Sequence, residues 1–306
     1  MTDRHAGAPT ADTFLAAIEV TPCAPEHFDQ AWLATTQPCP WPKAYGGDMV
    51  AQAVIAAVSS APGDRMLHSI HSYFLRPVDV GAQVRYEVEN VRDGRGYSTR
   101  QVRGYQNGKP VYVCLASFQV PEQGLDLTVP MPSGLPDPES LPSSAQVLAG
   151  QSGPAAEYWS AGRSFDMRHV PAPLYLSVAG EPVAAQAVWI KPFSRLPKDP
   201  LVHTAALAYV CDYTILEPIL RGHGLAWSEP GLATASLDHA MWFHRPAEMD
   251  EWVLYSQRAI SAQSNRGLAG GYLHDRSGRL MATVLQEGMV RAPQSPRVVN
   301  PERGPS

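Results

Sequence analysis

The sequence predicts an α+β protein made of two copies of one unit, each a helix followed by a mostly antiparallel sheet of at least four strands. Two observations indicate the duplication. The same order of elements occurs on both sides of a proline-rich segment, and the peptide FLRP at residues 74–77 returns as FHRP at residues 243–246, 169 positions later. Because self-similarity at this length marks a repeated structural unit, the two halves are expected to share a fold.

The first copy is expected to begin with a helix and to continue with strands. Residues 45–63 start with glycines, are filled by alanine and valine and end in Ser-Ala-Pro-Gly, a pattern typical of a helix and its end. The turn Asn107-Gly108 lies between two strand-like runs and is a strong signal for a hairpin. The strand-like runs of this copy are residues 67–77, 83–91, 97–106 and 110–120.

The second copy repeats this order. Residues 201–220 are apolar nearly all round, which is typical of a buried helix. Strand-like runs follow, and Gly278 in the turn at residues 276–278 lies 170 positions after Gly108. The expected strands of this copy are residues 234–246, 252–261, 267–275 and 280–290.

Proline divides the chain into parts. The segments at residues 121–142 and 293–305 are rich in proline, which removes a backbone donor and fixes φ, so both are expected to be linker rather than packed structure. The expected parts are a flexible N-terminal segment (1–27), a first domain (28–124), a proline-rich linker (125–159), a second domain (160–292) and a flexible tail (293–306).

Composition excludes several classes of protein. Of 306 residues, 44% are hydrophobic, and 24 Lys and Arg face 29 Asp and Glu for a net charge of −5. This balance argues against coating nucleic acid or an anionic membrane, because both depend on clustered positive charge. The four cysteines show no C-x-x-C pair, no apolar run approaches the roughly 18 residues of a membrane span, and the N-terminus lacks a signal-peptide core. A cytoplasmic protein with reduced cysteines and no membrane span is therefore expected.

Two polar residues stand where apolar ones are expected. The common G-x-S-x-G, Walker A and H-E-x-x-H motifs are absent. Asp212 lies within the apolar second helix, and Gln286 is the only polar residue on one face of the last strand. An unpaired buried carboxylate costs several kcal/mol. Asp212 therefore either has a structural partner or lines a cavity, and Gln286 either bonds a passing backbone group or belongs to a site.

Other polar positions are weaker candidates. Ser236 and Asp238 are expected on the same face of their strand, whereas His239 is expected on the opposite face, so Asp238 and His239 do not suggest a catalytic triad. Gln52 is polar among apolar neighbours of the first helix, 160 positions before Asp212, and is a candidate counterpart of that residue.

Five motifs in order carry a family resemblance. The chain resembles the bacterial type II acyl-CoA thioesterases and their peroxisomal relatives in eukaryotes, over roughly residues 40–125 and 160–291. The matching stretches are Tyr45-Gly46-Gly47 with Gln52-Ala53 and Ala56-Ala57, residues 68–77 (HSIHSYFLRP), residues 106–110 (QNGKP) with 116–119 (ASFQ), residues 238–246 (DHAMWFHRP), and Gln286-Glu287-Gly288.

The resemblance implies a double hotdog fold, in which each copy is a long helix wrapped by an antiparallel sheet. It also implies hydrolysis of fatty acyl-CoA to free acid and CoA, with no metal, no cofactor and no covalent intermediate. The family's water-activating Asp, hydroxyl and Gln fall on Asp212, Ser236 and Gln286. Serine replaces the threonine of the bacterial pattern and lacks the methyl group that restricts the rotamer, so looser positioning is expected.

The residue types suit this chemistry. Hydrolysis of a thioester needs a held water, a base and donors for the developing oxyanion. Burial is expected to raise the pKa of Asp212 towards working pH, while Ser236 and Gln286 hold the water. Backbone N–H groups after Gly46 and Gly47, at a helix start, are candidates to bind the carbonyl oxygen.

Further expectations concern the first copy and the substrate. Gln52 is kept as a candidate substrate-binding residue beside Gly46 and Gly47, and Asp48 places a carboxylate near that helix start. Gln286 aligns with Ala116 in the first copy, which cannot orient a water, so one active site per chain is expected. The first copy then either shapes the acyl pocket or serves as scaffold.

Two alternatives stay open. A protein of this fold can bind acyl-CoA without hydrolysing it, although all three polar positions are filled here. A hotdog hydratase or dehydratase needs a histidine near the aspartate, and His203 is the only one in the helix of Asp212, more than two turns away. Unpaired sheet edges favour a homo-oligomer.

Overall fold

The computed structural model describes residues 8–180 and 182–292. The expected tail at residues 293–306 lies outside this range, as do residues 1–7. The elements of the first copy are α1 (Asp12–Ala17), β1 (Thr21–Cys23), β2 (Gln30–Thr35), α2 (Gly46–Ser60), β3 (Met66–Phe74), β4 (Gln83–Asp93), β5 (Tyr97–Gln106) and β6 (Lys109–Gln119).

The segment between the copies and the second copy contain the remaining elements. Between the copies lie a 3₁₀ helix (Pro138–Ser140), α3 (Ser144–Val147), α4 (Pro154–Glu157) and a π-helical turn (Tyr158–Gly162). The second copy contains β7 (Phe165–Val170), β8 (Ala185–Pro192), α5 (Pro200–Val210), α6 (Glu217–Gly222), β9 (Ala233–Ser236), β10 (Asp238–Phe243), β11 (Val253–Gln263), β12 (Arg266–Asp275) and β13 (Leu280–Arg291).

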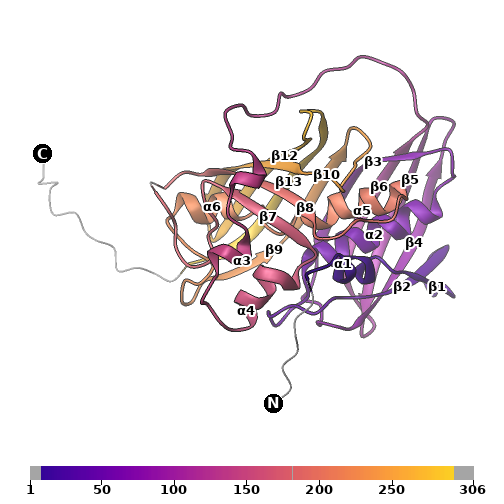
Figure 1. Cartoon of the computed structure of the whole chain (residues 1–306). Coiled ribbons are helices and arrows are strands. Elements are labelled where there is room, and N and C mark those ends of the chain that lie inside the picture. The colour runs from indigo at the N-terminus through magenta and orange to yellow at the C-terminus, as the bar shows by residue number, and fades with distance from the viewer. Residues whose placement is uncertain (1–7, 181, 293–306) are drawn as a thin grey trace, which may run out of the picture.

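The two copies share one antiparallel sheet (Figure 1). Its strand order is β1-β2-β4-β5-β6-β3-β10-β13-β12-β11-β8-β7, and β9 pairs with β13 beside this path. At the junction, Ile70 of β3 lies opposite Met241 of β10, and Ser72 lies opposite His239. Ile70 corresponds to His239 through the 169-residue repeat, and Met241 corresponds to Ser72. The second pair is therefore the repeat of the first, and the pairing of the strands follows the repeat found in the sequence.

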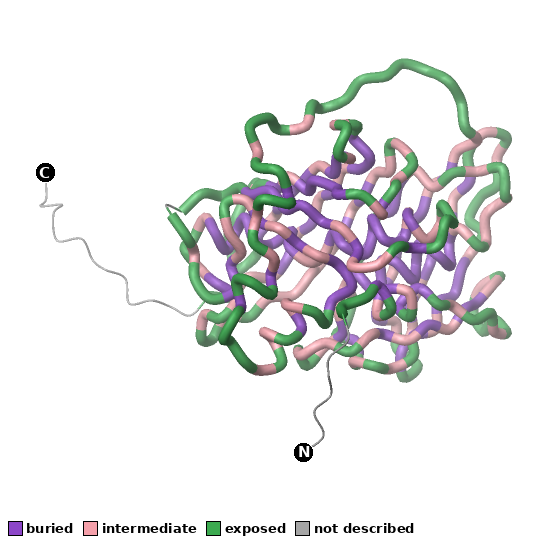
Figure 2. The backbone as a smooth tube through the Cα atoms, viewed as in Figure 1, coloured by how far each residue is buried: buried purple, intermediate pink, exposed green. Residues whose placement is uncertain are grey.

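The helices α2 and α5 pack against each other, and α2 also packs against strands β2 to β6 of the sheet. Small side chains permit their close approach: a Cβ added to Gly47 would lie 2.4 Å from the carbonyl oxygen of Tyr209. Eleven residues of α2 are buried, because the helix is covered on nearly every side. In Figure 2 the buried residues gather in the interior of the molecule, and the exposed residues gather mainly in the loops around it.

The expected helix at residues 201–220 is interrupted. The structure has α5 and α6 instead, with turns at residues 211–216 between them. Pro218 has no N–H to donate to the carbonyl of Thr214, four residues earlier, and that carbonyl accepts from Glu217 instead, at 2.9 Å. Asp212 therefore lies in a turn just after α5 and not inside a continuous helix.

Residues 8–27 differ from the expected flexible segment, because part of them is packed. Phe14 of α1 is fully buried, with its ring centroid 5.4 Å from that of Phe165 and 5.1 Å from that of Tyr209. Its backbone N–H donates to Ser164 Oγ at 2.7 Å. The apolar ring thus anchors this segment on the second copy.

The expected linker at residues 125–159 is also partly packed. Residues 121–130 are exposed and carry no regular structure, and they arch over the sheet from β6 (Figures 1 and 2). Beyond them, Met131, Leu135 and Leu141 pack on a small cluster that includes Trp189 and Trp252. The linker therefore covers the second copy with apolar side chains, which the proline content alone did not indicate.

Candidate active site

A β-bulge between β9 and β10 determines which side chains share a face. Ser236 lies opposite Gly288, whereas Ala240 lies opposite Leu285, so this strand has one extra residue. At the bulge, Leu237 N–H donates to the carbonyl of Glu287 at 3.0 Å. A bulge shifts the alternation of side chains by one position.

The bulge overturns one expectation from the sequence. Ser236 and Asp238 were expected on one face, with His239 on the other. In the structure Ser236 and His239 both reach Gln286, while Asp238 Oδ1 accepts the N–H of Glu287 at 2.8 Å. The expectation assumed that side chains alternate along an unbroken strand, whereas the extra residue shifts this alternation by one position.

Three predicted residues meet at one point. Ser236 Oγ donates to Asp212 Oδ1 at 2.7 Å, and Gln286 Nε2 donates to the same oxygen at 2.6 Å. Gln286 Nε2 lies 3.0 Å from Ser236 Oγ. Asp212 comes from the turn after α5, Ser236 from β9 and Gln286 from β13. The cluster therefore holds one carboxylate oxygen with two donors and leaves the other oxygen available.

His239 belongs to the same cluster and was missed in the sequence. Its Nδ1 lies 2.7 Å from Gln286 Oε1. Because the Gln286 amide nitrogen donates to a carboxylate, its oxygen faces the ring and Nδ1 must carry the proton. His239 therefore fixes the direction of the Gln286 amide. The available signal was its place in the motif at residues 238–246, but strand alternation pointed it the wrong way.

Burial shifts the pKa values of both ionisable groups. Desolvation raises the pKa of Asp212, while hydrogen bonds from Ser236 and Gln286 and the nearby His239 and Lys43 oppose the rise. Desolvation lowers the pKa of the fully buried His239. The imidazole is therefore neutral near pH 7, and its Nε2 is buried without a hydrogen-bond partner among the described residues.

The first copy brings the start of α2 to this cluster. A Cβ added to Gly46 would lie 2.6 Å from Asp212 Oδ2, so only glycine permits this approach. The first N–H groups of a helix lack partners within it, and Gly46, the first residue of α2, brings this end of the helix beside Asp212 Oδ2. Lys43, just before the helix, donates to the carbonyl of Thr234 at 2.7 Å, and burial lowers its pKa.

The structure does not bring Gln52 to this cluster. Gln52 Nε2 donates to the carbonyls of Ala17 at 2.9 Å and Thr35 at 3.1 Å, and its Oε1 accepts from the Tyr86 hydroxyl at 2.7 Å. These bonds tie α2 to its surroundings within the first copy. The geometry favours an architectural use of this amide.

Asp48 is a second buried carboxylate near the helix start. It is fully buried, and its Oδ2 accepts the N–H of Gln37 at 2.8 Å. Desolvation raises its pKa to about 7, and the nearby Asp212 adds to the rise. Its other oxygen has no hydrogen-bond partner among the described residues, so the neutral, protonated form costs less to bury than the ionised form.

The corresponding positions of the first copy are apolar. Through the 169-residue repeat, Leu67 corresponds to Ser236 and Ile70 to His239. Ile70 lies opposite Ala116, the counterpart of Gln286. The strand pair β3–β6 is irregular at the same place, between Leu67 and Ser69, so the backbone is repeated while the polar side chains are not.

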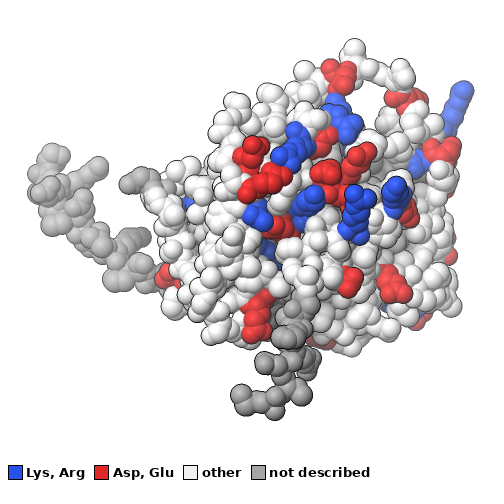
Figure 3. All heavy atoms as spheres, viewed as in Figure 1, with Lys and Arg blue, Asp and Glu red and all other residues white. Residues whose placement is uncertain are grey.

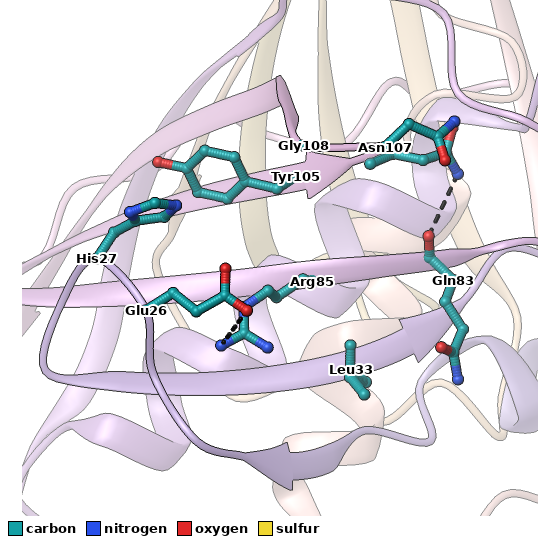
Figure 4. A pocket seen from close by; sticks show the side chains of 9 residues that line it. Glu26, His27, Leu33, Gln83, Arg85, Tyr105, Asn107 and Gly108 are labelled. Atoms are coloured by element: carbon teal, nitrogen blue, oxygen red, sulfur yellow. Dashed lines mark hydrogen bonds and ion pairs between the residues drawn. The ribbon is translucent and has the colours of Figure 1, made fainter.

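A surface hollow elsewhere on the first copy has a different character (Figure 4). Its volume is about 260 Å³, and no residue of the Asp212 cluster lines it. The Arg85 guanidinium there already donates to Glu87 at 2.7 Å and to Cys23 Sγ at 3.3 Å. The lining residues are Glu26, His27, Leu33, Gln83, Arg85, Tyr105, Gln106, Asn107 and Gly108.

Other kinds of site find little support in the part of the chain that the structure describes. Within residues 8–180 and 182–292, no group of three His, Cys, Asp or Glu side chains is arranged to hold a metal ion. No helix of this part has the length and apolar character needed to cross a membrane. Figure 3 shows positive and negative side chains intermingled on the face in view, an arrangement unlike the basic surfaces that bind nucleic acid.

Two family models match the chain, one on each copy. Residues 161–289 match the model described as acyl-CoA thioesterase. Residues 37–119 match the model described as acyl-CoA thioesterase N-terminal domain. Each matched range lies within one of the two domains expected from the sequence, 28–124 and 160–292.

Curated relatives match over most of their length. Acyl-CoA thioesterase 2 of Haemophilus influenzae is 36% identical over 256 residues, which cover 81% of this chain and 87% of the relative. Human acyl-coenzyme A thioesterase 8 is 34% identical over 274 residues, covering 82% of each chain.

Solved structures agree with the architecture. Acyl-CoA thioesterase II TesB2 from Mycobacterium marinum superposes with a TM-score of 0.73 at 31% identity, covering 91% of this chain and 98% of that one. A protein with a hot dog fold from Alicyclobacillus acidocaldarius gives a TM-score of 0.73 at 17% identity, covering 92% and 98%. The predicted double hotdog fold is confirmed.

Proposed function

The chain belongs to the acyl-CoA thioesterase family, and we propose that it hydrolyses fatty acyl-CoA to a free fatty acid and CoA with a water activated by Asp212. One observation carries this assignment of the site: Ser236 and Gln286 both donate to one oxygen of Asp212. The other oxygen lies at the start of α2, where Gly46 leaves room. The proposed site thus combines a base, Asp212, with a hydroxyl and an amide that bind it, and with the backbone N–H groups at the start of α2.

The proposed reaction proceeds through general base catalysis. Asp212 takes a proton from a water as the water oxygen forms a bond to the thioester carbon. The backbone N–H groups at the start of α2 stabilise the negative charge that develops on the carbonyl oxygen. The carbon–sulfur bond then breaks, the thiolate of CoA leaves, and it takes up the proton that Asp212 had accepted. No covalent bond to the protein forms in this sequence.

The environment of Asp212 supports its role as base. The desolvation that raises its pKa makes the ionised carboxylate a better proton acceptor near neutral pH. Ser236 and Gln286 keep the carboxylate in one orientation, and His239 keeps Gln286 from rotating. Serine is sufficient here, because the hydrogen bond to Asp212 needs only the hydroxyl.

His239 makes hydration a second candidate reaction to test. A hotdog hydratase needs a histidine near the aspartate, and the sequence offered only His203. In the structure His203 Nδ1 accepts the N–H of Met249 at 3.0 Å, while His239 lies one side chain away from Asp212. Its Nδ1 bonds Gln286 and its Nε2 has no partner among the described residues, so hydration of an enoyl-CoA is measured alongside hydrolysis.

Release of CoA thiol from acyl-CoAs of increasing chain length tests the proposal. Wild-type protein is expected to release thiol, and the profile then names the preferred chain length. A loss of enoyl absorbance from a 2-enoyl-CoA without thiol release would establish the hydratase instead. Binding of acyl-CoA by calorimetry with neither reaction would establish a non-catalytic acyl-CoA-binding protein.

Two further properties belong to the proposal. A homo-oligomer is supported by exposed apolar side chains on the central strands, among them Tyr73 (59% exposed) and Leu115 (50% exposed). Light scattering of the purified protein measures its mass, and a monomer would refute this part. A cytoplasmic location is supported by four free cysteines, which suit a reducing compartment, and cell fractionation tests it.

A further inference from the structure

A fully buried arginine lies within an arrangement of aromatic rings beside the Asp212 cluster. The Arg163 guanidinium carbon is 5.5 Å from the ring centroid of Tyr213 and 5.6 Å from that of Tyr175. Tyr213 stacks on Tyr45 with centroids 4.2 Å apart, and Tyr175 stacks on Trp159 with centroids 4.8 Å apart. We call these five side chains the arginine–aromatic stack.

Arg163 forms no ion pair with a carboxylate in the described part of the chain, and it is only 3% exposed. The charge of Glu217 favours the charged form of Arg163 only from beyond ion-pair distance. One terminal nitrogen donates to Ser144 Oγ at 3.0 Å and to the Tyr175 hydroxyl, while Nε has no partner among the described residues. The faces of the two tyrosine rings therefore supply much of the compensation.

A buried arginine without a partner carboxylate is unfavourable for the stability of the fold. Moving a charged group out of water is costly unless a partner charge compensates for it, and Arg163 has no such partner within the residues that the structure describes. A methionine at position 163 would fill most of the same space without an unpaired Nε. The presence of arginine at this position thus calls for a role that an apolar side chain does not fulfil.

The stack ends on the two segments that form the proposed site. Tyr213 directly follows Asp212, in the turns at residues 211–216, where no regular helix fixes the backbone. Tyr45 directly precedes Gly46, and its hydroxyl donates to the carbonyl of Tyr209 at 2.6 Å. Holding Tyr213 against Tyr45 therefore holds Asp212 against the start of α2.

We propose that Arg163 is a positioning residue for the thioesterase reaction: by binding the face of Tyr213 it presses this ring onto Tyr45 and so sets the position of Asp212 relative to the N–H groups of α2. This inference rests on the proposed function. Arg163 does not touch the reacting atoms; it acts through Tyr213. The segment that precedes the second copy thereby takes part in building the site.

The test compares Arg163→Met and Arg163→Lys with wild type and with Asp212→Asn. A shift of about 1 Å in a reacting group can cost about 100-fold in rate, so Arg163→Met is expected to lower kcat by about 10- to 100-fold. KM should stay within about twofold of wild type, and the thermal midpoint should not fall, because no ion pair is broken. Arg163→Lys, which keeps a cation for the ring faces, should recover part of kcat.

A matched control distinguishes positioning from general loss of structure. Arg100 is also fully buried, but it lies in the first copy and pairs with Asp93 at 2.8 Å. Arg100→Met should lower the thermal midpoint and leave kcat unchanged, the opposite pattern to Arg163→Met. The pH profile of kcat adds a second readout: loss of position lowers kcat at every pH without moving the acidic midpoint.

Each remaining outcome overturns the inference in a recognisable way. If Arg163→Met keeps wild-type kcat while Asp212→Asn is inactive, the proposed function stands and the positioning role is wrong. A shift of the acidic midpoint would show a direct electrostatic role in place of positioning. If wild-type protein releases no thiol from any acyl-CoA, the proposed function fails and the role of Arg163 falls with it.

Discussion

The two copies have the same sheet register but different chemistry. In the second copy, Ser236, His239 and Gln286 form a connected polar cluster with Asp212. At the corresponding places the first copy has Leu67, Ile70 and Ala116. Both copies keep an irregular strand pairing at this point.

The helices differ in the same way. The first helix, α2, runs without interruption from Gly46 to Ser60, whereas α5 ends at Val210 and turns follow. The interruption places Asp212 where its side chain faces both its own sheet and the start of α2. In the proposed site, the second copy supplies Asp212, Ser236 and Gln286, while the first copy supplies the start of α2, where Gly46 permits the close approach. A shared backbone is therefore no guide to shared chemistry.

Among the changes that test this difference between the copies, replacing the base should have the largest effect on kcat. Asp212→Asn keeps the shape of the side chain but removes its ability to take a proton, so kcat is expected to fall by about 10²- to 10⁴-fold. Thiol release at saturating acyl-CoA measures it. Asp166→Asn, a change to a carboxylate that pairs with Arg168 on the edge strand β7, should leave kcat unchanged. Full activity in Asp212→Asn would mean that the site lies elsewhere.

Removing the histidine should have the next largest effect. His239→Leu leaves Gln286 Oε1 without its donor, so the amide can rotate away from Asp212, and kcat is expected to fall by about 10- to 100-fold. His239→Gln, which retains an N–H donor, should recover part of the rate. His274 is equally buried in the same copy and binds the carbonyl of Val129 at 2.9 Å.

The control for that prediction is His274→Leu. It should lower the thermal midpoint without lowering kcat, because its bond holds the linker and not the site. Equal losses of kcat in the two variants would show that burial of the ring, and not its bond to Gln286, is what matters.

The hydroxyl at position 236 should have a smaller effect. Ser236→Ala removes one of two donors to Asp212, so kcat should fall by about tenfold, roughly the value of one hydrogen bond to a charged group. Because that bond lowers the pKa of Asp212, its loss should move the acidic limb of the pH profile to higher pH. Ser236→Thr should match or exceed wild type, and Ser98→Ala in the first copy is the control. An unchanged acidic limb in Ser236→Ala would contradict the bond's role.

Asp48 should influence stability more than rate. Its pKa of about 7 in the folded state exceeds 3.8, the ordinary value, so folding favours its protonated form. This contribution is fully present below pH 3.8 and is lost as pH rises towards and through 7, which amounts to about 4 kcal/mol. Asp48→Asn should therefore raise the thermal midpoint at pH 8 and do so much less at pH 4.

The same variant should change activity only slightly. Asp212 adds to the rise in the pKa of Asp48, which reaches about 7, so Asp48 is largely uncharged on the acidic side of the profile. Asp48→Asn should therefore move the acidic limb of kcat little, and kcat at pH 8 should stay within about twofold of wild type. A thermal midpoint that is lower at pH 8 would show that the ionised form of Asp48 is stabilised in the fold.

Periodicity and repetition predicted the duplicated α+β architecture, because alternation and turn residues act over a few positions. The meeting of Asp212, Ser236 and Gln286 was predicted through the family resemblance and is found in the geometry. His239 was not predicted, because a single extra residue at Leu237 reverses every later side chain, and no local signal marks such a bulge. The packing of Phe14 and of the linker was missed for a related reason: single apolar residues in irregular segments carry no period.

The pairing of β3 with β10 has a consequence for the integrity of the chain. Leu125 and Leu127 are almost fully exposed within residues 121–130, and exposed chain without regular structure is a preferred place for proteolytic nicking. A cut there leaves five residue pairs joining β3 to β10, and α2 remains packed on α5. The two fragments would stay together as a non-covalent heterodimer with Gly46 on one and Asp212 on the other, so the same enzyme is compatible with a split gene.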